Sequence, residues 1–155
     1  MQALYQLIRK IKIFIFNISL KDKLLFMEAF ILTGIIRFKI LKVPFNKLKK
    51  SMGNVNKESS KEISIEDAKV VMNIREKVTI VSNHTPWESL CLVQAMTVQR
   101  MLKKRGLSTT LYLGVNKDKE NNMRAHAWIR CGSIYVTGGN GSGYANVAKF
   151  SNEGC

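Results

Sequence analysis

The amino-acid sequence predicts an α+β fold, in which helices come first along the chain and strands follow. Before Gly106, apolar residues recur at helical spacing in several segments. Between Thr109 and Thr137, short runs rich in β-branched and aromatic residues are separated by turn residues. The chain has 155 residues, of which 46% are hydrophobic, so it is long enough for one domain with a buried core.

The first fifty residues are expected to be helical and basic. Residues 3–17 carry apolar side chains at helical spacing, with Lys and Arg between them. Ser19 precedes Asp22 by three residues, which is the pattern of a helix N-cap, and a second helix is expected to run to about Phe38. We interpret residues 1–50 as a helical basic extension.

The next elements are separated by a break at Pro44. A short basic helix to Lys50 is expected after it. Residues 51–63 are polar and contain few core candidates, so they are interpreted as a linker or mobile loop. Ser64 then supplies an N-cap for a helix over about 65–80.

The most distinct helix in the sequence is expected to begin near Thr85. Thr85 can cap it, Pro86 suits the first helical position, and Glu88 completes a capping box. Ser89 is an alternative cap for a helix that starts later. Gly106 can supply the left-handed residue at which the helix stops. Almost every residue between positions 90 and 98 is apolar, which predicts that protein surrounds this helix.

Three strands are expected to follow as an antiparallel meander. They cover residues 109–115, 123–131 and 133–137. Four glycines between positions 138 and 143 predict a flexible loop after the last of them.

The formal net charge is +14, and the positive charge is concentrated in the N-terminal third. Residues 1–52 hold eleven Lys and Arg but only two acidic residues. Such a charge favours acidic peptides or anionic lipid surfaces. Nucleic acid is not expected as a partner, because no recognised nucleic-acid motif accompanies the basic residues. The apolar run 24–36 is too short to cross a bilayer, although a helix lying on the membrane surface is compatible with it.

The three cysteines, Cys91, Cys131 and Cys155, are too few for a disulfide framework and favour a reducing, cytoplasmic location. They have no CxxC spacing, and the chain has two histidines, so neither a metal site nor a cofactor is expected.

Cys91 and His126 form the one pair of residues that predicts chemistry. Cys91 lies near the start of the buried helix, and His126 lies on a strand 35 residues later. This arrangement is typical of papain-like and transglutaminase-like cysteine enzymes. His126 would be the general base, Cys91 the nucleophile, and the Cys91 backbone N–H the oxyanion donor. Taken singly, each residue is better explained as structural, the cysteine in a core and the histidine on a half-exposed strand; it is the pair that favours a catalytic role.

Other residues compete for roles at the site. Cys131 and Cys155 are alternative nucleophiles, but neither lies at a helix start. His84 is interpreted as a turn residue. Trp87, four residues before Cys91 on the same predicted helical face, would wall the cleft or belong to the core.

Several short motifs resemble the lasso peptide biosynthesis B2 proteins, which are transglutaminase-like leader peptidases. The shared residues are Pro86-Trp87, Cys91-Leu92, Gln94-Ala95, Met101-Leu102, Arg105-Gly106, Gly114-Val115 and Ala125-His126-Ala127-Trp128, with Glu28-Ala29 and Pro44-Phe45 in the helical extension. The resemblance implies that residues 64–155 form a transglutaminase-like catalytic domain.

The resemblance also implies a reaction and partners. The protein would remove the leader from a ribosomally made lasso precursor peptide, and a separate ATP-dependent macrolactam cyclase would then close the ring. The leader would be held by a stand-alone recognition protein.

The chain departs from the family at one position. Members with a full triad carry an aspartate about twelve residues after the histidine, where this chain has Gly138. Asn140 or a backbone carbonyl could orient the imidazole instead, or a partner could complete the site. Two other functions stay open: acyl transfer by the same Cys–His pair, and a non-catalytic scaffold that binds the precursor.

Overall fold

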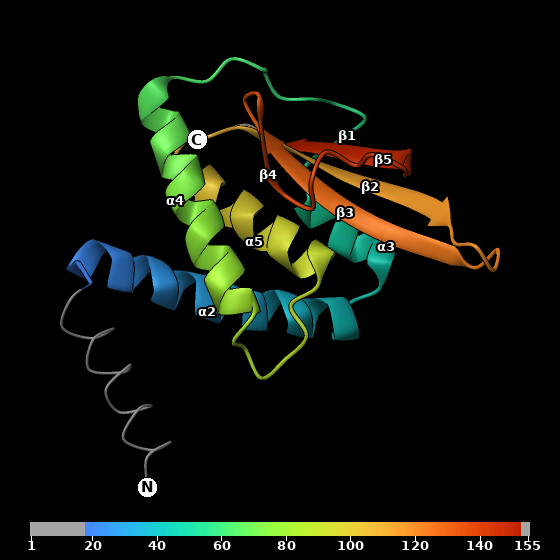
Figure 1. Ribbon diagram of the computed structural model, residues 1–155, viewed down its shortest axis with the longest axis horizontal. Helices are drawn as coiled ribbons and strands as arrows, with labels where there is room; N and C mark the ends of the chain where they lie inside the picture. Colours follow the sequence, from blue (N-terminus) through green and yellow to red (C-terminus); the bar gives the residue numbers. More distant parts are fainter. Residues whose placement is uncertain (1–17, 153–155) are drawn as a thin grey trace, which may run out of the picture.

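The computed structural model describes residues 18–152 and has the predicted α+β class. Figure 1 shows the helices gathered beside a twisted sheet, with α5 (Cys91–Lys103) between α4 (Ile65–Ser82) and the strands. Helix α5 packs on the sheet and also contacts α2 (Leu20–Lys42) and α4, so it is the central helix of the fold. The helix predicted over residues 3–17 lies outside the described residues.

The two N-caps predicted from sequence are confirmed. The Ser19 hydroxyl accepts a hydrogen bond from the Asp22 N–H at 3.1 Å and begins α2, which continues four residues beyond the predicted end. The Ser64 hydroxyl accepts one from the Asp67 N–H at 3.0 Å and begins α4. The predicted short basic helix is also present, as α3 (Phe45–Leu48) followed by the 3₁₀ turn η1 (Lys49–Ser51).

The start of the central helix needs a correction. The capping box at Thr85 is not formed, and the helix begins at Cys91 with Leu90 as N-cap. The Thr85 hydroxyl bonds to the Trp87 carbonyl at 2.9 Å, and Glu88 is paired with Arg37 of α2 at 2.6 Å. Because these side chains are used elsewhere, residues 83–90 form an irregular connection.

The sheet has five antiparallel strands in the order β1-β5-β2-β3-β4. The predicted strands are present as β2 (Thr109–Lys117), β3 (Met123–Cys131) and β4 (Ile134–Thr137). Two strands were not predicted: β5 (Ala145–Asn152), which pairs with β2, and the short β1 (Asn54–Val55). The sheet is therefore more than a meander, since the last strand returns to the far side of β2.

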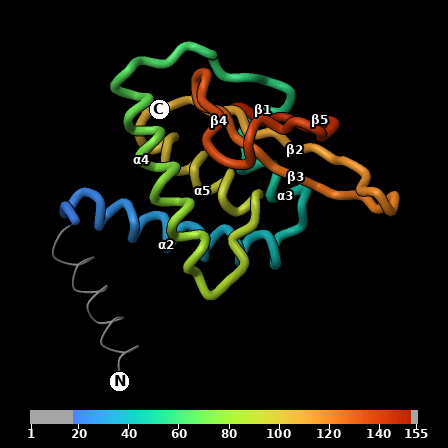
Figure 2. Tube along the Cα trace, in the orientation of Figure 1, coloured from blue at the N-terminus to red at the C-terminus, as the bar shows by residue number. Residues whose placement is uncertain are grey.

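Residues 51–63, which the sequence indicates to be a linker or mobile loop, are packed in part against the core. Figure 2 shows this stretch running between η1 and α4, and most of it has neither helix nor strand. It is nevertheless packed, because Met52 is fully buried and its carbonyl accepts a hydrogen bond from Gln99 of α5 at 2.8 Å. Helix α2 also contributes to the same core as α5, so residues 18–152 share one hydrophobic core.

Arg130 fastens this stretch to the sheet. Its side chain is only 3% exposed, and its guanidinium donates to the carbonyls of Ser59 and Ser60 at 3.0 and 3.1 Å. It also donates to the Gly132 carbonyl and pairs with Glu58 at 3.4 Å. The buried charge is therefore compensated mainly by backbone oxygens.

We expect Arg130→Met to lower the free energy of unfolding by about 3 kcal/mol, because it leaves buried carbonyls without a donor. Urea denaturation would measure the change. Arg124→Met is the matched control, since Arg124 forms an exposed ion pair with Asp118 at 3.1 Å and its loss should cost less than about 1 kcal/mol. Equal losses in the two variants would contradict the structural role of Arg130.

No helix within residues 18–152 is long and apolar enough to span a membrane.

Candidate active site

Cys91 is the first residue of α5 and is half-buried against the hydrophobic core. The helix therefore starts later than the capping box at Thr85 predicted. The alternative with Ser89 as N-cap is closer, but the N-cap is Leu90, one residue further along. In the first turn, backbone N–H groups have no partner within the helix, and the helix dipole favours negative charge. Cys91 therefore lies at the end of α5 where backbone N–H groups are available to a bound group.

The connection before Cys91 is held by hydrogen bonds that fix where the helix begins. The hydroxyls of Thr85 and Ser89 are hydrogen-bonded at 2.9 Å. The Gln94 side-chain amide donates to the Ser89 carbonyl at 2.8 Å. These contacts tie the first turn of α5 to the residues that precede the thiol.

His126 lies on β3, opposite Gly114 of β2, and is half-buried. Its Nε2 is 2.8 Å from the carbonyl oxygen of Gly138. A carbonyl oxygen only accepts, so Nε2 carries the proton, and Nδ1 of the neutral ring has a free lone pair. The ring of Tyr144 packs against the imidazole, with the ring centroids 4.8 Å apart.

Gly138 is the position at which the sequence resemblance implied an aspartate, and here its backbone carbonyl oxygen is the acceptor for His126. Its φ of +78° is in the left-handed region, and a Cβ at this position would collide with the Ala127 carbonyl oxygen. The side-chain oxygen of Asn140 accepts instead from the Ser142 N–H at 3.0 Å. Of the orienting groups considered from sequence, the backbone carbonyl is the one in hydrogen-bond contact with His126.

Cys91 and His126 approach the sheet from different sides. Ala127 and Ile129 of β3 belong to the core that α5 covers, and Cys91 packs against that core. Side chains alternate along a strand, so His126 and Trp128 point to the other face, where Trp128 lies against the loop that contains Gly138. Within residues 18–152, no hydrogen bond joins the Cys91 sulfur to the imidazole.

Trp87 does not share a helical face with Cys91, because it lies in the irregular connection before α5. Its ring packs on α2 instead, 5.0 Å from the ring of Phe30 and close over Gly34. His84 is exposed, and its Nδ1 lies 2.7 Å from the Ile80 carbonyl at the end of α4, which fits the interpretation as a turn residue.

Cys131 differs from Cys91 in its burial. Cys131 is buried in the core, and burial raises the pKa of its thiol to about 11, so it stays protonated at neutral pH. Cys155 lies outside the described residues. No group of three or more His, Cys, Asp or Glu side chains within residues 18–152 is arranged to hold a metal ion.

Comparison with known families agrees with this fold. The profile of the transglutaminase-like superfamily matches residues 40–151. The chain belongs to the transglutaminase-like superfamily. Its members are generally cysteine-based enzymes, and the fold is compatible with peptidase or acyltransferase activity. No curated protein and no solved structure shows significant similarity to the chain.

One feature of the candidate site was not predicted from sequence, and another was only one of several alternatives. Tyr144 was not singled out, although it covers the imidazole, because an isolated Tyr after a glycine-rich loop has no motif that marks it. The Gly138 carbonyl could be anticipated only as one of several orienting groups, since a backbone acceptor leaves no trace in residue type.

Proposed function

We propose that this transglutaminase-like protein is a cysteine peptidase that removes the leader from a ribosomally made lasso precursor peptide. The observation that carries the proposal is the His126–Gly138 hydrogen bond, because it gives the imidazole an orienting acceptor at the family's aspartate position. The location of Cys91 at the start of α5, and membership of the superfamily, support the same conclusion.

In the proposed reaction, His126 transfers the protons and Cys91 forms the covalent bond to the leader. Nδ1 of His126 takes the proton of the Cys91 thiol, and the thiolate attacks the scissile carbonyl. The Cys91 N–H donates to the oxyanion as it forms. The imidazolium then protonates the departing amine, which is the new N-terminus of the core peptide. Water, deprotonated by His126, hydrolyses the thioester and releases the leader with a free carboxylate.

This reaction requires hydrogen-bond contact between the His126 imidazole and the Cys91 sulfur. Catalytic hydrogen bonds in free enzymes are often long or absent and tighten only when substrate binds. His126 lies near the start of β3, whose C-terminal residue Cys131 pairs with the first residue of β2, close to the end of α5. His126 therefore lies toward the Cys91 end of the helix but on the opposite face of the sheet, so the proposed reaction requires the first residues of β3 to turn the imidazole to the face that α5 covers.

Two partners complete the proposed pathway. A stand-alone leader-recognition protein presents the precursor, and an ATP-dependent lasso cyclase uses the amine that cleavage releases. The positive net charge of +14 favours contact with acidic peptide segments.

The proposal is tested by incubating the protein with a precursor peptide and its recognition protein and following leader release by mass spectrometry. One product pair, cut between leader and core, is the expected result. Hydroxylamine separates the alternatives: a leader hydroxamate formed at the expense of the free acid would favour acyl transfer. If the parent protein binds the precursor but does not cleave it, the result would favour the non-catalytic scaffold.

We also propose that α2 contacts an anionic membrane surface. The helix is apolar on two opposite sides: Leu25, Ala29 and Ile36 are buried in the core, whereas a second stripe faces solvent. The members of that exposed stripe are Leu20, Leu24, Met27, Ile31, Ile35 and Phe38. Lysines at both ends of α2 complement the charge of anionic headgroups.

Co-sedimentation with vesicles of mixed phosphatidylcholine and phosphatidylserine tests this contact. The double variant Leu24→Gln/Phe38→Gln should bind roughly tenfold more weakly, because two exposed apolar side chains no longer enter the interface. Val147→Gln is the control, since Val147 is equally exposed but lies on β5. Parent protein that stays in the supernatant would contradict the proposal.

A further inference from the structure

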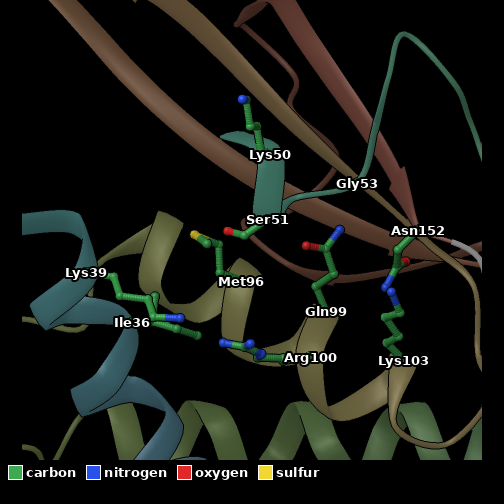
Figure 3. A pocket seen from close by; sticks show the side chains of 10 residues that line it. All are labelled: Ile36, Lys39, Lys50, Ser51, Gly53, Met96, Gln99, Arg100, Lys103 and Asn152. Carbon is green, nitrogen blue, oxygen red and sulfur yellow. The ribbon is translucent and has the colours of Figure 1, made fainter. Parts of the chain in front are cut away.

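A basic cavity lies between α2, η1 and α5, away from Cys91 and His126. Its volume is about 400 Å³, and Figure 3 shows the side chains around it. Four of the lining residues are cationic and none is acidic. None of the four forms an ion pair with any residue between 18 and 152. The cations are Lys39, Lys50, Arg100 and Lys103.

Three of the four cations, Lys39, Arg100 and Lys103, come from α2 and α5, and Lys50 comes from η1. On α5, Met96, Arg100 and Lys103 recur at helical spacing and share one face. Figure 3 shows Lys39 of α2 and Arg100 of α5 reaching toward each other, while Lys103 extends toward Asn152. Like charges that face one another without a counter-ion repel, so an anion between them would be favoured.

Asn152 is a second, independent observation that points to a ligand. The residue is only 6% exposed and lines the cavity. Its side-chain oxygen accepts from the Thr109 N–H at 2.9 Å, but its Nδ2 is buried and has no hydrogen-bond partner among the described residues. A buried amide donor without a partner costs about 1–3 kcal/mol, so this group is rarely left unsatisfied.

The walls of the cavity indicate what kind of anion fits. Ile36 and Met96 are buried and give it an apolar side, which suits the aliphatic stem of an acidic side chain better than a fully hydrated ion. Gln99 is already committed, because its amide donates to the Met52 carbonyl. The positive charge of the cavity comes from Arg100 and the lysines, and the neutral hydrogen-bond donor is the side-chain amide of Asn152.

We propose that this cavity binds the carboxylate of an acidic peptide segment, with Arg100 and Lys39 pairing with the charge and Asn152 Nδ2 donating to an oxygen. Arg100 lies nine residues along α5 from Cys91, a rise of about 13 Å, so the site is separate from the proposed nucleophile. Binding there needs no turnover, and the inference does not depend on the proposed peptidase activity.

The test is the fluorescence anisotropy of a labelled peptide rich in Glu, with its Glu→Gln counterpart as the neutral probe and inorganic phosphate as competitor. Arg100→Gln should weaken binding of the Glu peptide about fivefold or more. Asn152→Asp, which keeps the oxygen that accepts from Thr109 but replaces the donor with a negative charge, should weaken it about tenfold or more.

Arg75→Gln is the matched control, because Arg75 is exposed on α4 and its replacement changes the net charge by the same amount. It should change the affinity less than about twofold. Equal weakening by Arg75→Gln, equal binding of the neutral peptide, or displacement by phosphate at the peptide's own concentration would overturn the proposal. Thermal unfolding checks each variant, and Arg100→Gln decides the matter if Asn152→Asp does not fold.

Discussion

Replacement of Cys91 by Ala is expected to reduce leader release by roughly a thousandfold or more, because the variant has no nucleophile to form the thioester. Cys91 is half-buried at the start of α5, so loss of its sulfur removes little packing, and the variant should still fold and bind the precursor. The measurement is the initial rate of leader release by mass spectrometry, at equal concentrations of folded protein.

Cys131→Ala is the matched control. Cys131 is buried in the core, and its raised pKa keeps the thiol protonated. Its replacement should lower stability by about 1 kcal/mol, through loss of a small buried group, and leave the rate within a few-fold of the parent. Leader release that survives Cys91→Ala but is lost in Cys131→Ala would show that Cys131, and not Cys91, is the nucleophile.

Replacement of Gly138 by Ala is expected to lower both the stability of the protein and its rate of leader release. The residue needs φ +78°, and a Cβ would collide with the Ala127 carbonyl oxygen, so β3 and the loop must move apart. We expect the free energy of unfolding to fall by about 2–4 kcal/mol. Leader release should fall more than stability alone explains, because the carbonyl that orients His126 moves with the loop. Denaturation and initial rates would be measured on the same preparations.

Gly139→Ala separates collision from backbone conformation. Gly139 also has a positive φ, +66°, but nothing lies within 4 Å of the Cβ position. It should therefore cost only about 1 kcal/mol and leave the imidazole in place. Gly138→Asp should behave like Gly138→Ala rather than restore a triad, since its Cβ meets the same obstacle. A gain of activity in Gly138→Asp would show that the loop has a different conformation in the active enzyme.

Local signals in the sequence predicted much of the fold. Ser19 and Ser64 are reliable starts because their hydroxyls satisfy backbone N–H groups three residues later. The same logic failed at Thr85, because tertiary contacts of Glu88 with Arg37 and of Trp87 with Phe30 outweigh a local cap. Strand β5 was missed because its burial comes from pairing with β2, whose residues lie 30 (145 − 115) to 43 (152 − 109) positions earlier in the chain.

The candidate site was predicted in part. The positions of Cys91 at a helix start and of His126 on a strand follow from short-range patterns that the structure retains. The orienting carbonyl of Gly138 and the covering ring of Tyr144 depend on how a glycine-rich loop folds back over β3. Such a path is set by positive φ angles and close packing, which residue types restrict but do not determine.

Alkylation of the thiol is the most direct measurement of whether Cys91 is the nucleophile. The parent protein is treated with iodoacetamide at neutral pH, and residual leader release is compared with the extent of modification at each cysteine by peptide mapping. We expect leader release to fall in proportion to alkylation of Cys91, the precursor peptide to slow alkylation of Cys91, and Cys131 to stay unmodified. Full leader release by protein whose Cys91 is completely alkylated would contradict this expectation.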